Sequence, residues 1–125
     1  MTTKPPVQAK LMFVIPFCDR QAFEAHGRGY LSHVCVDVEG QLYPVFFYDP
    51  IRLSQDLQTN DENGRPFLAD AGMIVVSEIT LETMQNAIQH LYVEGFFNRF
   101  VPITYQQLAL ASSADPYSWP PRTFT

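Results

Sequence analysis

Residues 30–48, YLSHVCVDVEGQLYPVFFY, decide the fold because they predict a β-hairpin. Along the first arm, Val34, Val36 and Val38 alternate with polar residues, which is the period of a strand with one buried face. The short stretch Glu39-Gly40-Gln41 supplies the turn, and residues 42–48 form a second apolar arm. The two arms therefore pair as antiparallel neighbours.

Three apolar runs outside the hairpin complete the predicted sheet. Residues 10–17 have the continuous apolar pattern of a strand buried on both faces, so we expect a central strand. Residues 73–79 predict another buried strand, and residues 100–104 predict one that returns beside the first. Between these two, Thr80 as N-cap and apolar residues at helical spacing predict a helix that ends at Gly95. The order strand, helix, strand indicates a β-α-β crossover.

The predicted architecture is α+β, with a single mixed or mostly antiparallel sheet of about five strands and one main helix, residues 80–95, packed on a face. We expect residues 9–111 to form this single domain. Residues 1–8 are expected to be a flexible N-terminal arm, and residues 112–125 an extended, proline-bearing C-terminal tail.

Smaller features follow from local chemistry. Residues 21–26 and 51–57 each suit a short helix, and residues 59–66 have the composition of a surface loop. Pro44 has no N–H to donate, so we expect it at a strand edge or bulge, facing away from any partner strand. Gly27-Arg28-Gly29 predicts a plain connection.

Composition restricts the class of protein. The chain has 125 residues, 46% of them apolar and 17% charged, so it can bury a core and fold as an ordered domain. Its net charge of −5 disfavours nucleic-acid binding, which needs a basic face. No apolar run approaches the roughly 20 residues of a membrane span, and the polar N-terminus does not resemble a signal peptide. We therefore expect a soluble, cytoplasmic protein without membrane association.

The cysteines and histidines do not form a recognisable site. Cys18 and Cys35 lack CxxC spacing, and we expect both to be reduced packing residues. No cysteine-hydrolase signature surrounds Cys18, and residues 59–70 match a calcium loop incompletely. No pair of the three histidines has the i,i+4 spacing of metal ligands; these are His26, His33 and His90. We assign no catalytic residue, no metal and no cofactor.

Aromatic residues are in surplus on both faces of the second hairpin arm. Tyr43 and Phe47 share one face, whereas Phe46 and Tyr48 share the other. The helix can cover one face; the other needs the N-terminal segment, the C-terminal tail with Trp119, a ligand or a partner subunit.

These features favour a small acidic, non-catalytic protein-binding module, for example an inhibitor or immunity-type protein of a basic partner. Self-association as a homodimer would also use the aromatic surface. The candidate binding residues are three aromatics and three acids: Tyr43, Phe46, Tyr48, Asp37, Glu39 and Asp49.

The alternative is a small-molecule-binding or enzymatic domain with a pocket between sheet and helix. On the strand face opposite the valines, His33, Cys35 and Asp37 would line that pocket.

Overall fold

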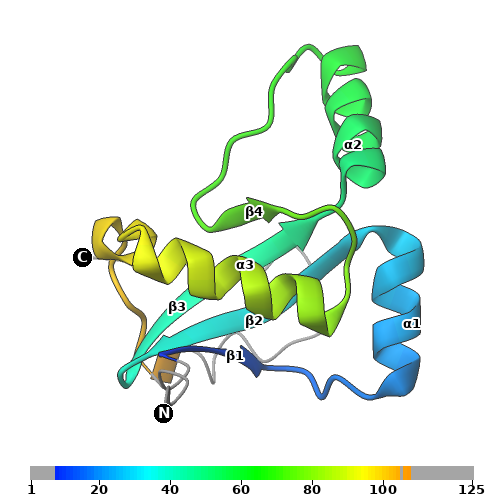
Figure 1. The fold of residues 1–125 in the computed structure, drawn as a ribbon. Coiled ribbons are helices and arrows are strands. Elements are labelled where there is room, and N and C mark those ends of the chain that lie inside the picture. The colour runs from blue at the N-terminus through cyan, green and yellow to red at the C-terminus, as the bar shows by residue number, and fades with distance from the viewer. Residues whose placement is uncertain (1–7, 105, 108–125) are drawn as a thin grey trace.

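The structure is a computed structural model that describes residues 8–104, 106 and 107. Within these residues it contains four strands, three α-helices and one 3-10 helix (Figure 1). In chain order the elements are β1 (Ala9–Phe13), α1 (Asp19–Arg28), β2 (Tyr30–Val38), β3 (Gln41–Tyr48), α2 (Pro50–Glu62), β4 (Met73–Val75), α3 (Leu81–Val93) and the 3-10 helix η1 (Phe96–Arg99). The predicted N-terminal arm, C-terminal tail and Trp119 lie outside the described residues, apart from Gln8.

The strands form one mixed sheet in the order β1-β2-β3-β4, which confirms the predicted α+β class. Neighbouring strands are antiparallel except β3 and β4, which are parallel. The described residues form four strands rather than about five, because residues 100–104 make only an isolated bridge. In that bridge Ile103 pairs with Leu42 of β3, so the expected position beside the first strand is wrong.

The hairpin is confirmed, with Tyr30 opposite Tyr48 and Val38 opposite Gln41. Glu39 and Gly40 both have positive φ, of 52° and 88°, as the tight turn of a twisted hairpin requires. Pro44 lies in β3 beyond the segment that pairs with β4. The Phe46 N–H donates to the Gly72 carbonyl, and N–H groups two residues apart point to the same side of a strand. The backbone N–H that Pro44 lacks would therefore point to a part of the β3 edge where β4 offers no carbonyl to accept it.

Strand β1 lies at the sheet edge, so the predicted central position is wrong. Leu11 and Phe13 pack into the core cluster on one face of the sheet. Met12 and Val14 pack against the cluster on the opposite face. Because both faces are covered, the edge strand has the apolar pattern of a central one.

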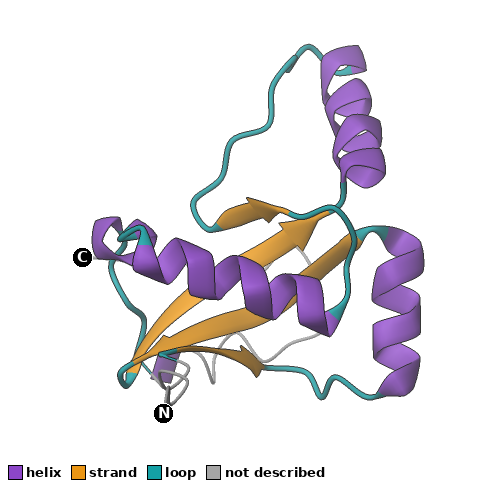
Figure 2. Cartoon of the chain, in the orientation of Figure 1, coloured by secondary structure: helices purple, strands orange, loops and turns teal. Residues whose placement is uncertain are grey.

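Helix α3 crosses one face of the sheet (Figure 2) and confirms the predicted helix. The Thr80 hydroxyl accepts from the Thr83 N–H at 3.2 Å, and Gly95 has φ of 78° just past the helix end. Met84 and Ile88 of this helix are fully buried. However, α3 leads into η1 rather than into a strand, and the β-α-β unit is β3-α2-β4.

No single helix dominates the described chain, because α1 has 10 residues and α2 and α3 have 13 each. Helix α2 begins at Pro50, with Asp49 as its N-cap, and continues through Glu62 into the stretch expected to be a loop. It has no buried residue, and α2 and the loop after it stand away from the sheet (Figure 1).

The core consists of two clusters, one on each face of the sheet. The larger lies under α3, and the smaller is formed by Cys35, Leu42, Phe46, Tyr48 and Ile103. Cys35 is fully buried, as expected, whereas Cys18 is exposed ahead of α1, which contradicts its predicted packing role.

Candidate functional site

A cavity of about 460 Å³ lies between α1, the start of β2 and the segment that joins β1 to α1. Its apolar wall consists of Phe13, Ile15, Pro16, Phe17 and Leu31. The rings of Phe13 and Phe17 stack with centroids 4.4 Å apart and an interplanar angle of 6°. The end of β1 and the joining segment thus line the cavity with a stacked aromatic pair.

One face of α1 forms the second wall. Gln21, Glu24 and Arg28 line the cavity at positions i, i+3 and i+7, which fall on the same side of a helix. Glu24 is paired with Arg20 on the outer surface, at 3.1 Å. Among the described residues, no hydrogen bond or ion pair engages the Arg28 guanidinium, so its donors remain available.

An irregularity in β2 brings polar groups to the third wall. The β2–β3 register shifts between Leu31 and Val34, and His33 in this bulge has φ of 61°. Ser32 Oγ and His33 Nδ1 are 2.8 Å apart, and His33 is only 2% exposed. Burial raises the pKa of Tyr30 at the start of the strand. Tyr30, Ser32 and His33 all line the cavity, so one short segment of β2 supplies it with polar atoms.

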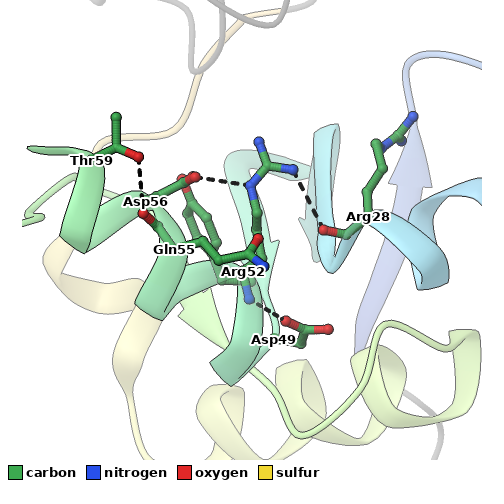
Figure 3. Close-up of polar contacts among 7 residues, drawn as sticks. Arg28, Asp49, Arg52, Gln55, Asp56 and Thr59 are labelled. Atoms are coloured by element: carbon green, nitrogen blue, oxygen red, sulfur yellow. Dashed lines mark hydrogen bonds and ion pairs between the residues drawn. The ribbon is translucent and has the colours of Figure 1, made fainter.

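Arg52 of α2 completes the lining and is held by a polar network (Figure 3). Its Nε donates to Asp56 Oδ1 at 2.9 Å, while the Tyr48 hydroxyl donates to Asp56 Oδ2 at 2.8 Å. The guanidinium carbon of Arg52 lies 5.7 Å from the ring centroid of Tyr30, and Nη1 reaches the Arg28 carbonyl at 3.5 Å. Burial, followed by the hydrogen bond and charge of Asp56, raises the pKa of Tyr48.

The structure brings only one residue of the predicted pocket to the cavity. His33 lines it, whereas Cys35 is buried in the smaller core cluster, where burial raises the pKa of its thiol to about 12. Asp37 lies at the hairpin turn, where Oδ1 accepts from the Gly40 N–H at 2.9 Å. The three side chains therefore do not meet.

The three aromatics predicted to bind a partner lie on opposite faces of the sheet. Tyr43 packs toward the α3 side, with its ring 5.5 Å from that of Phe97. Phe46 and Tyr48 are 4% and 8% exposed and pack with Tyr30 on the other face. The described chain itself covers most of Phe46 and Tyr48.

The three acids predicted with them lie at opposite ends of the hairpin. Glu39 is at the turn near Asp37, and its carboxylate accepts from the Tyr92 hydroxyl at 3.3 Å. Asp49 is at the open end, where its carboxylate accepts from the Arg52 N–H at 2.8 Å. A partner-binding role for this set stays a prediction.

Sequence reasoning missed Tyr30, Ser32, Arg28 and Arg52 as members of a site. Arg28 carries a signal, because it stands between two glycines at the end of a helix, directly before the strand with the bulge. Arg52 carries none, because its approach to the cavity depends on how α2 leaves β3.

The described part of the chain contains neither a cluster of metal ligands nor a helix that could span a membrane. No group of three or more His, Cys, Asp or Glu side chains there is placed to hold a metal ion. None of the helices there has the length and apolar character needed to cross a bilayer.

Comparison of the chain with protein-family models, with curated proteins and with solved structures gives no match.

Proposed function

We propose that the protein is a small-molecule-binding domain whose ligand occupies the cavity between α1, β2 and the segment after β1. The observation that carries the proposal is the lining: aromatic and aliphatic side chains form one part, and a few polar groups converge from three elements. Ligand pockets have this composition and typically measure roughly 300–1,000 Å³. At about 460 Å³, the cavity falls in that range.

The local backbone supports the same proposal. His33 has positive φ in a bulge at the cavity wall, a conformation that costs free energy for a residue other than glycine. Bulges often direct side chains toward binding sites. The bulge directs Ser32 and His33 to a cavity that already has an apolar wall. The function we propose is ligand binding without catalysis.

The test is a screen of small organic fragments by two-dimensional amide NMR on the full chain. We expect ligand-dependent shifts at residues 31–33 and along α1. Ser32→Phe places a ring in the cavity and should abolish them, whereas Ser54→Phe makes the same change on the exposed surface of α2. Shifts confined to other surfaces, or equal binding by the Ser32→Phe variant, would overturn the proposal.

Protein binding, in the form of a homodimer, is the second candidate. Helix α2 has no buried residue, although packing normally stabilises helices of this length. Ile51 and Leu57 on this helix are 70% and 41% exposed, and Phe67 in the following loop is 51% exposed. A second copy packed on this segment would cover them.

Light scattering tests the homodimer. The wild type should be a dimer that Leu57→Lys dissociates and that Val93→Lys, on α3, leaves intact. A monomeric wild type would contradict the homodimer.

A further inference from the structure

We propose that the ligand of this cavity is an organic anion with a flat apolar body, whose acidic group binds Arg28 and Arg52. The inference rests on the proposed function, because it specifies what the cavity binds. Neither arginine was predicted as a site residue, and the chain as a whole is acidic, with a net charge of −5.

The charge of the lining has the opposite sign to that of the chain. Two guanidinium groups and one carboxylate border the cavity, and Arg52 is ion-paired with Asp56 at 2.9 Å, so Arg28 leaves one net positive charge there with His33 counted as neutral. The carboxylate of Glu24 is already paired with Arg20. A local cationic cavity in an acidic protein attracts an anion and repels a cation.

The two arginines retain donors for such a group. A guanidinium has five N–H donors. Arg52 uses Nε for Asp56 and Nη1 for the Arg28 carbonyl, which fixes its position and leaves other N–H groups unused. Figure 3 shows Arg52 held between these two contacts; the Arg28 side chain extends from its backbone away from the Arg52 guanidinium. A carboxylate or sulfonate suits donors of this kind because each oxygen accepts charge-assisted hydrogen bonds.

The cavity is polarised along α1. Gln21 lies in the first turn, next to the segment that carries Phe17, and Arg28 lies in the last turn. Seven residues of helix separate them by roughly 10 Å. The stacked pair Phe13 and Phe17 therefore borders the apolar end, and Arg28 borders the cationic end. A ligand that satisfies both ends has an aromatic or aliphatic body and one terminal acidic group.

A matched pair of fluorescent probes tests the inference. 8-Anilinonaphthalene-1-sulfonate and N-phenyl-1-naphthylamine share an aromatic skeleton, and only the first has an acidic group. We expect the sulfonate to bind the wild type at least about tenfold more tightly, and added salt to reduce this preference. Arg28→Met should weaken sulfonate binding about tenfold and leave the neutral probe unchanged, because Arg28 is exposed and its loss removes no described contact.

Arg99→Met is the matched control, since Arg99 is exposed on η1 and does not line the cavity. It removes the same charge and should leave both affinities unchanged. If Ser32→Phe blocks both probes, but the probes bind equally and Arg28→Met affects neither, the anion inference is overturned and the proposed function stands. If neither probe binds the wild type, or if Ser32→Phe blocks neither, both proposals fail.

Discussion

Gly29 and Asp49 close the open end of the β2–β3 hairpin in direct backbone contact. The Asp49 N–H donates to the Gly29 carbonyl at 2.8 Å, and the Asp49 carboxylate occupies the space where a Cβ on residue 29 would lie. Gly29 also has φ of 69°, in the left-handed region. Because Arg28 precedes Gly29 and Asp49 caps the helix that carries Arg52, this contact positions both cationic residues of the cavity.

Gly29→Ala should destabilise the protein for two separate reasons. The left-handed backbone costs an alanine about 1–2 kcal/mol, and the new methyl group must displace the Asp49 carboxylate from the start of α2. We expect the free energy of unfolding, measured in urea, to fall by about 2 kcal/mol or more.

Gly27→Ala is the matched control, two residues earlier in α1. A Cβ at this position meets nothing within 4 Å. Alanine is the better helix former, so this variant should be equal to the wild type or more stable by about 0.5 kcal/mol. Equal losses in the two variants would show that neither the left-handed φ nor the Asp49 contact makes position 29 special.

The sequence predicted the elements whose signals are local. The hairpin follows from alternation and a short turn that contains glycine, and α3 follows from Thr80 and an apolar stripe. Both depend on residues close together in the chain. The mixed α+β sheet then follows from combining these elements, although its strand count and order do not.

The parts that sequence reasoning missed depend on long-range packing. Residues 10–17 are apolar throughout because other parts of the chain pack on both faces of this strand. This pattern is the same for a strand at the sheet edge and for one at the centre, so it does not reveal the position. Ile103 makes one bridge with Leu42 where a strand was expected, and no local pattern distinguishes these outcomes. The cavity joins residues 13, 28, 32 and 52, which only the fold brings together.

Tyr48→Phe should destabilise the protein because it removes a half-buried hydrogen bond to a carboxylate. The Tyr48 hydroxyl lies 2.8 Å from Asp56 Oδ2, whose other oxygen holds Arg52. Hydrogen bonds to charged groups contribute about 1.5–3 kcal/mol, and a loss of about 1.5 kcal/mol in urea unfolding is expected. In an Asp56→Asn background the same change should cost less, because the two residues interact.

Tyr92→Phe provides the comparison, since its hydroxyl donates to Glu39 at 3.3 Å in an exposed position. Solvent replaces such a contact, so little change in unfolding is expected. A Tyr48→Phe variant as stable as Tyr92→Phe would contradict the importance of the Asp56 network.

Glu39→Asn should stabilise the hairpin. Glu39 has φ of 52° at the first position of the turn, and asparagine before glycine is favoured in this conformation. We expect a gain of about 0.5 kcal/mol in the free energy of unfolding. Glu94→Asn removes the same charge at a residue with φ of −77° and should give no such gain. An unchanged Glu39→Asn variant would indicate that the turn is not strained.

The stability of the folded protein should depend on the Cys35 thiol at alkaline pH. Burial raises its pKa from the ordinary 9.0 to about 12, so the unfolded chain loses this proton first. The corresponding stability is complete below pH 9 and is lost as the pH rises from 9 toward 12, with a slope of about 1.4 kcal/mol per pH unit. Cys35→Ala leaves a small cavity, which lowers stability at pH 7, but it abolishes this slope.

The measurement is urea unfolding of the wild type and Cys35→Ala at pH 7 and at pH 10.5. The wild type should be the more stable protein at pH 7, and its advantage should shrink by about 2 kcal/mol at the higher pH. Subtracting the variant removes the contribution of Tyr48, whose pKa is also raised and which both proteins retain. Cys18→Ala, at an exposed cysteine, should follow the wild type at both values. A difference between wild type and Cys35→Ala that stays constant with pH would mean that the thiol is not buried in the folded protein.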